Sequence, residues 1–150
     1  MLALTLPTAI LLWLGATFTA LTPDRPLFQP SAELRAMDAL NRIAPRDVVV
    51  LSLKETGNVL PAWTDLKVYV GHGPETVSAG QKKEIARQFF AGTLDAAAQR
   101  DLLAVVDYVF AGPLEAAEAG DASPAWADAL PLALPPEETA PVRIYEVPHE

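Results

Sequence analysis

Three short runs of apolar and mostly β-branched residues constrain the fold of this chain more than any other feature. They read DVVVLSL at 47–53, KVYVGH at 67–72 and DYVFAG at 107–112. The centres of these runs are continuously apolar, which is typical of strands that are buried on both faces. Stretches with helical periodicity lie between the runs, and this alternation predicts an α/β domain with parallel strands.

The helical stretches carry recognisable start and stop signals. SAELRAMDALNRIA at 31–44 has its apolar residues on one face, Ser31 is placed to cap it, and Pro45 ends it. Ser78 and Gln81 have capping-box spacing, which predicts a second helix that ends at Gly92. A third helix is expected around 95–105.

The last third of the chain contains a polar stretch and a closing pair of strands. Residues 115–127 are rich in alanine and acidic residues, and we expect them to be loose. LPLAL, a proline-rich loop and VRIYEV at 142–147 predict an antiparallel pair at the sheet edge. The predicted fold is α/β, with a small Rossmann-like, mostly parallel sheet, flanking helices and an antiparallel edge over residues 31–150.

The N-terminal segment has a different character. LALTLPTAILLWLGATFTAL at 2–21 has no charged residue, and a helix of this length is about 30 Å long, the thickness of a bilayer core. We therefore expect a transmembrane helix over 1–22. A signal peptide fits less well because the basic start and small-residue cleavage site are missing, and a buried helix of a water-soluble protein is the third alternative. Residues 23–30 read as a proline-rich tether.

Charge and composition exclude several function classes. The net charge is −8, and every charged side chain lies at or after Asp24, so an acidic domain of this kind is not expected to bind nucleic acid. The absence of cysteine excludes thiolate chemistry and disulfides, and two histidines make a multi-histidine metal site unexpected. Neither GxGxxG nor GxxxxGK[ST] occurs, and we expect no cofactor.

Polar or turn-rich loops follow the three predicted strands, at 54–58, 71–76 and 112–115. If the strands are parallel, these loops share the carboxyl edge of the sheet, where open α/β folds bind ligands. The candidate ligand- or partner-binding residues of this edge are Glu55, Asn58, His72, Glu75, Thr76 and Glu115.

A purely structural reading of the same residues is favoured over binding, and binding over catalysis. Turn residues and helix N-termini need glycines, acids and hydroxyls without any ligand. His72 with Glu75 or Glu55 is a possible acid/base pair, but no serine or cysteine nucleophile stands beside it. Trp63 and Trp126 are expected to be core or interface aromatics.

Several of these strings carry a resemblance to a known family. LSLKETGNVLPAWTDLKVYVGHGPET, then KKEIARQFF and DYVFAGPLE, resemble the C-terminal extracytoplasmic domain of bacterial multi-pass membrane proteins related to class-C glycosyltransferases. The resemblance runs from about Leu2 to Val147. Such enzymes use polyprenyl-phosphate sugar donors, and their catalytic acids lie between early membrane helices that this sequence lacks, so no catalytic residue carries over.

The resemblance implies an accessory domain of a glycosyltransferase-like membrane protein, anchored at the bacterial membrane and facing the extracytoplasmic side. Its expected partners are the membrane, the transmembrane part of a glycosyltransferase, or a sugar or lipid-linked acceptor. The placement outside the cytoplasm opposes the arginines that follow the apolar segment, which favour a cytoplasmic domain. The alternative is a free-standing small α/β binding module whose N-terminal segment is cleaved or buried.

Overall fold

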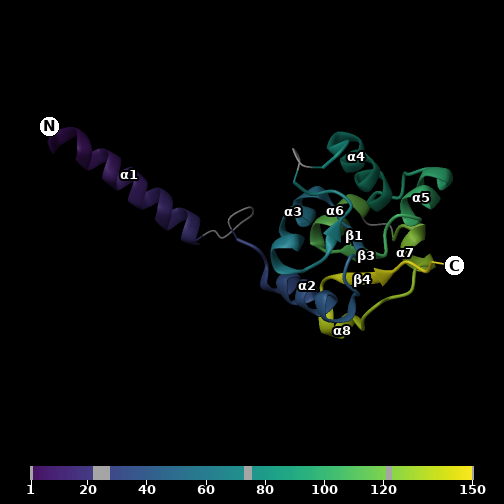
Figure 1. Ribbon diagram of the computed structural model, residues 1–150. Coiled ribbons are helices and arrows are strands. Elements are labelled where there is room, and N and C mark those ends of the chain that lie inside the picture. Colours follow the sequence, from purple (N-terminus) through teal and green to yellow (C-terminus); the bar gives the residue numbers. More distant parts are fainter. Residues whose placement is uncertain (1, 22–27, 73–75, 121–122, 150) are drawn as a thin grey trace. The chain divides into compact units, whose positions relative to one another are not determined.

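The structure is a computed structural model that describes residues 2–21, 28–72, 76–120 and 123–149. The chain divides into two compact units, Met1–Pro30 and Ser31–Glu150, which are described separately. Figure 1 gives the element labels that are used below.

The first unit contains one helix, α1 (Leu2–Leu21), as the uncharged sequence predicts. Among the residues that the structure describes, no helix is long and apolar enough to cross a membrane. The prediction of a transmembrane helix is therefore not supported. Of the predicted tether, residues 23–27 lie outside the described part.

The second unit is built around a four-stranded sheet with the order β2-β1-β3-β4. Its strands are β1 (Val49–Leu51), β2 (Lys67–Val68), β3 (Tyr108–Ala111) and β4 (Arg143–Glu146). β1 pairs in parallel with β2 and β3, while β4 runs antiparallel to β3. The predicted α/β fold with a small, mostly parallel, Rossmann-like sheet and an antiparallel edge is confirmed. Each strand is shorter than the apolar run that predicts it.

Seven helices of this unit lie within the described residues and surround the sheet. They are α2 (Ser31–Ile43), α3 (Lys54–Trp63), α4 (Ala79–Phe90), α5 (Ala96–Leu103), α6 (Pro113–Ala119), α7 (Ala125–Ala129) and α8 (Pro136–Thr139).

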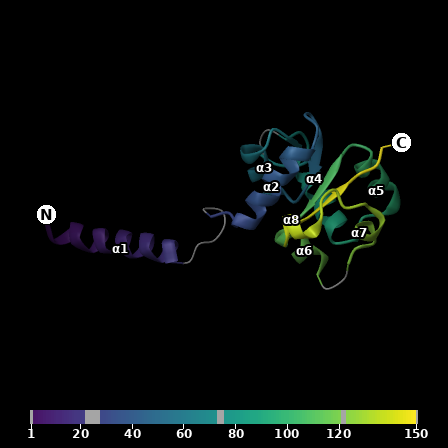
Figure 2. The same ribbon diagram turned by 90° about the horizontal axis from the view of Figure 1, so that it is seen from below.

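Successive strand residues pack alternately into two hydrophobic clusters, one on each face of the sheet. Val50 and Phe110 pack with Met37 and Leu40 of α2 and with Leu60 of α3. On the other face, the strand residues Leu51, Val109 and Tyr145 pack with α4, α5 and α7 through Phe89, Phe90, Leu102 and Trp126. Figure 2 shows α2 and α3 on one side of the sheet and α5 and α7 on the other. This two-sided cover is what a mostly parallel sheet requires, since both of its faces are apolar.

Several local predictions are wrong. LPLAL at 130–134 forms no strand among the described residues: Leu132 makes only an isolated antiparallel bridge to Tyr145, and β4 pairs with β3 instead. Residues 54–58 are not a loop but the start of α3, a helix that contains both Gly57 and Pro61. The segment expected to be loose contains α6 and α7. Ser78 precedes α4 but has a left-handed conformation with φ of 58° and makes no side-chain capping bond, so no capping box forms.

Candidate functional site

The three parallel strands bring the segments after β1, β2 and β3 to one edge of the sheet, as predicted. Backbone contacts join the first two segments. A Cβ atom at Gly57 would collide with the carbonyl oxygen of Val70, and one at Gly71 would lie 2.8 Å from the carbonyl oxygen of Gly57. Only glycine permits such a close approach of two backbones. α3 is thereby held tightly against the segment that follows β2.

Glu115 joins the first and third segments. The backbone N–H of Leu53 donates to Oε1 of Glu115 at 2.9 Å, and that of Gly112 donates to Oε2 at 3.0 Å. The side chain is only 1% exposed. Burial raises the pKa of the Glu115 carboxyl, and the hydrogen bonds that it accepts from backbone N–H groups oppose this rise. Glu115 is a structural brace whose two oxygens both accept backbone hydrogen bonds, and it is not exposed at the edge as the ligand- or partner-binding alternative requires.

A cleft of about 480 Å³ lies at this edge, between the start of α3, the middle of α4 and one face of α6. We call it the edge cleft. Its lining residues are Leu53, Lys54, Glu55, Lys83, Arg87, Leu114, Ala117 and Glu118. Three cationic, two acidic and three apolar side chains therefore line the edge cleft.

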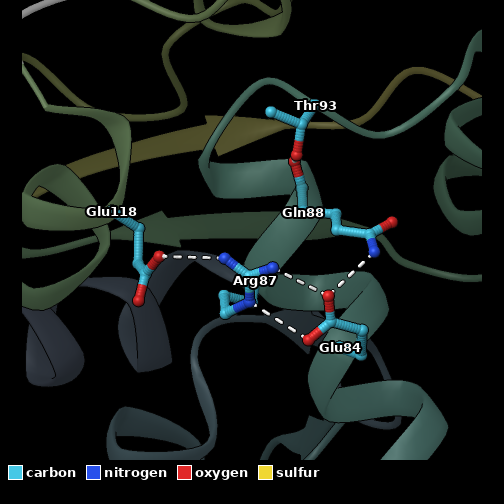
Figure 3. Close-up of polar contacts among 5 residues, drawn as sticks. All are labelled: Glu84, Arg87, Gln88, Thr93 and Glu118. Atoms are coloured by element: carbon cyan, nitrogen blue, oxygen red, sulfur yellow. Dashed lines mark hydrogen bonds and ion pairs between the residues drawn. The ribbon is translucent and has the colours of Figure 1, made fainter.

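Polar contacts to Glu84 and Glu118 hold the side chain of Arg87 in place in the edge cleft (Figure 3). Its guanidinium donates to Glu84 through Nε at 3.1 Å and Nη2 at 2.7 Å, and Nη1 lies 3.8 Å from Oε2 of Glu118 on α6. Gln88 donates to the same Glu84 carboxylate at 2.8 Å. These hydrogen bonds lower the pKa of Glu84 to about 2, with the bond from Arg87 as the largest cause. The network links α4 to α6 across the cleft and orients the Arg87 side chain.

Lys54 and Lys83 are two cationic residues of the edge cleft that are not engaged in ion pairs within the described part of the chain. Their ammonium groups are therefore available to an incoming group, as is the exposed carboxylate of Glu55. Charged donors and acceptors of this kind bind protein surfaces and polar ligands through charge-assisted hydrogen bonds.

The other predicted site residues are distributed unevenly around this edge. Asn58 is exposed on α3, and His72 is exposed in the segment after β2. Thr76 is half-buried, and its N–H and hydroxyl both donate to the carbonyl oxygen of His72, at 3.0 and 3.1 Å. None of these three lines the edge cleft. Glu75 lies outside the described residues.

The predicted acid/base pair is not formed between His72 and Glu55, because no hydrogen bond or ion pair joins them. The pairing of His72 with Glu75 falls outside the described residues. A histidine–carboxylate contact does occur elsewhere: Nε2 of His149 lies 3.1 Å from Oδ1 of Asp107 at the amino end of β3, the opposite edge of the sheet. The cavity beside His149 is lined by no serine, threonine or cysteine that could act as its nucleophile.

Sequence reasoning missed Lys83, Arg87 and Glu118. The first two lie four residues apart on α4, a spacing that places them on one helical face. Glu118 belongs to α6, where no helix was expected. Of the two tryptophans in residues 31–150, Trp126 is a core residue at 5% exposure, as predicted, whereas Trp63 is 57% exposed.

No family model, no curated protein and no solved structure matches this chain when it is compared with them. The geometry of the described residues therefore carries the functional argument.

Proposed function

We propose that residues 31–150 form a binding domain that performs no chemistry of its own, and that the edge cleft is its recognition surface. The observation that carries this proposal is the position of the cleft. It lies at the carboxyl edge of parallel strands, and helices that come from three separate segments supply its charged lining. Glu115 and the Gly57–Gly71 contact hold these segments together, which presents the charged groups in a preorganised arrangement.

The partner that we propose is a charged loop of a glycosyltransferase-like membrane protein, for which this domain serves as an accessory domain outside the cytoplasm. The support for this identity is the sequence resemblance at 51–76 and 107–115. The presence of both cationic Lys54 and Lys83 and acidic Glu55 in the lining supports a protein surface, because charges of both signs fix the register of a charged partner.

A photo-crosslinking experiment in cells tests this proposal. A photoreactive phenylalanine analogue replaces Glu55 in the full chain, and a matched control carries it at Glu138 of α8. We expect position 55 to crosslink to a multi-pass membrane glycosyltransferase, identified by mass spectrometry, and position 138 to give no such product. Equal crosslinking at the two positions, or products without a membrane glycosyltransferase, would contradict the proposal.

A second candidate function is a free-standing module that binds a hydroxyl-rich ligand such as a sugar. The volume of the edge cleft, about 480 Å³, favours this candidate because small-molecule sites typically occupy roughly 300–1,000 Å³. An NMR titration with glucose, mannose and N-acetylglucosamine separates the two candidates. Amide shifts confined to the cleft that disappear in Lys83→Ala would favour the sugar.

A further inference from the structure

A second cavity, of about 330 Å³, lies on the other face of α6. Leu114, Ala117 and Glu118 of this helix line the edge cleft, whereas Glu115, Ala116 and Ala119 line the second cavity. We call this cavity the aromatic pocket, because Phe90, Trp126 and Tyr145 form part of its wall, together with Arg143. α6 therefore separates two cavities of different chemistry.

The aromatic wall is held in place by its own contacts. Trp126 stacks on Phe89 at a centroid distance of 4.7 Å, and Phe90 and Tyr145 meet it edge-on at 5.7 and 5.4 Å. The indole N–H of Trp126 donates to the carbonyl oxygen of Phe89 at 2.8 Å, which fixes the orientation of the ring. A ligand ring would thus meet a rigid apolar surface and order few side chains on binding.

Two polar groups of the aromatic pocket have no partner among the described residues. The hydroxyl of Tyr145 makes no hydrogen bond within the described part of the chain. Arg143 on β4 is exposed and makes no ion pair there. A tyrosine hydroxyl can donate a hydrogen bond to a ligand, and an unpaired guanidinium is suited to binding a carboxylate through two parallel hydrogen bonds.

The charged residues that line the pocket favour a ligand with a single negative charge. Among the lining residues that the structure describes, Arg143 is the one cation and Glu115 is the one acid. Both oxygens of Glu115 accept backbone hydrogen bonds, so this carboxyl group is not available to neutralise Arg143. A monoanionic carboxylate matches this arrangement better than a doubly charged phosphate, which the Glu115 carboxylate would repel more strongly.

We propose that the aromatic pocket binds a small carboxylate that carries a ring, with the ring against Trp126 and Tyr145 and the carboxylate on Arg143. The volume of about 330 Å³ lies in the range of small-molecule sites. This site is independent of the edge cleft, because the two share no lining residue.

The experiment is an NMR titration of the isotope-labelled full chain with three probes. 2-Naphthoate carries both ring and carboxylate, 2-naphthol carries the same ring without the charge, and acetate carries the charge without the ring. We expect 2-naphthoate to shift the amides of Ala111, Ala116 and Tyr145 and to bind about ten-fold more tightly than 2-naphthol. Acetate is expected to leave these amides unshifted at the same concentrations.

Two variants and a matched control make the assignment specific. Arg143→Gln should remove the ten-fold preference for 2-naphthoate and leave the affinity for 2-naphthol unchanged. Ala116→Leu should fill the pocket and weaken both ring probes. Arg100→Gln, which changes an exposed arginine that lines a different cavity, should alter neither.

Three outcomes would overturn the proposal. They are failure of both ring probes to bind at millimolar concentration, equal affinity of 2-naphthoate and 2-naphthol, and retention of the 2-naphthoate preference in Arg143→Gln. Thermal unfolding of each variant shows that it is folded, and the exposed position of Arg143 makes its replacement tolerable.

Discussion

Glu115 shows how one buried carboxylate holds the candidate binding edge together. Its two oxygens accept hydrogen bonds from the N–H groups of Leu53 and Gly112, which follow the neighbouring strands β1 and β3. Each N–H lies where water cannot easily replace the carboxylate, since Leu53 and Gly112 are both buried. The position of Lys54 and Glu55 in the edge cleft therefore depends on a residue that is not exposed itself.

Replacement of Glu115 by alanine should destabilise the domain by about 2–4 kcal/mol. Two buried N–H groups would lose their acceptor, at roughly 1–3 kcal/mol each, and relief of the buried charge would offset part of that loss. Urea unfolding measures the difference. Glu118→Ala, on the exposed face of the same helix, is the control and should change stability by about 0.5 kcal/mol or less. A loss below about 1 kcal/mol for Glu115→Ala would show that the brace contributes little.

The raised pKa of Glu115 predicts a pH dependence with a definite sign. The folded-state pKa lies above the unfolded value of about 4.5, so the folded protein binds more protons between the two pKa values. The contribution of this group to stability is therefore greatest below about pH 4.5 and falls as the pH rises through that window. Glu115→Gln lacks this titration. We expect the wild-type stability, relative to Glu115→Gln, to decrease from pH 4 to neutral pH, and an increase would contradict the assigned shift.

In contrast to the raised pKa of the buried Glu115, the pKa of Glu84, on the surface, is lowered. Its carboxylate accepts hydrogen bonds from Arg87 and Gln88, and its pKa is about 2. We expect Arg87→Gln to raise this pKa toward the ordinary value of 4.5. NMR detection of the side-chain carboxyl carbon during an acid titration measures both values. The shift should also shrink in 1 M salt, because the groups are exposed and screened, and a salt-independent pKa would indicate another cause.

At the scale of elements, α3 owes its position to two glycines. Gly57 lies where a side chain would strike the carbonyl oxygen of Val70, and Gly71 approaches the carbonyl oxygen of Gly57 from the other side. Glycine has a low helical propensity, but the lack of a side chain at Gly57 lets α3 pack directly against the backbone after β2.

A pair of glycine-to-alanine changes tests this close approach. Gly57→Ala should destabilise the domain by more than about 3 kcal/mol, because backbone must move to accommodate the methyl group. Gly80→Ala is the matched change in α4, where a Cβ atom meets no other atom within 4 Å, and it should stabilise by up to about 0.5–1 kcal/mol through the unfolded state. Thermal unfolding of both variants gives the comparison. Similar effects in the two positions would contradict the packing described for α3.

The elements themselves were predictable where one physical signal dominated. The three apolar runs identified β1, β2 and β3, and the apolar face of residues 31–44 identified α2, because burial of such patterns leaves few alternatives. VRIYEV identified β4, whereas LPLAL, its expected partner, forms no strand among the described residues. α3 was missed because Gly57 and Pro61 are turn residues in most local contexts, and their role here is set by contacts with β2 that are distant in sequence. α6 was missed because its alanine-rich sequence has no amphipathic pattern.

The candidate site, like the fold, was predictable from the sequence only in part. Parallel strands were enough to predict that the loops meet at one edge, and Glu55 was correctly placed at that edge. The sequence could not show that Glu115 faces inward, because burial of a carboxylate depends on two N–H groups from different segments. Nor could it predict Arg87 and Lys83, whose positions depend on how α4 packs against α6.

At the scale of the whole molecule, the sheet and both hydrophobic clusters lie entirely within Ser31–Glu150. A chain that begins at Thr22 should therefore fold without α1. For roughly 120 residues the expected unfolding enthalpy is about 80 kcal/mol near 60 °C, and unfolding should be cooperative, with coincident transitions by far- and near-ultraviolet circular dichroism. A broad transition, or an enthalpy far below this value, would mean that the domain needs a further partner to complete its core.

The near-ultraviolet circular dichroism signal tests whether the aromatic cluster around Trp126 is ordered in the chain that begins at Thr22. Trp126 is buried and stacked on Phe89, whereas Trp63 is 57% exposed. In the chain that begins at Thr22, Trp126→Phe should remove most of the tryptophan band, because an ordered and asymmetric environment produces that band. Trp63→Phe should leave it nearly intact and serves as the control. If the band were instead lost with Trp63 and retained with Trp126, the aromatic cluster would not be the ordered core of the isolated domain, and the aromatic pocket would lose its rigid wall.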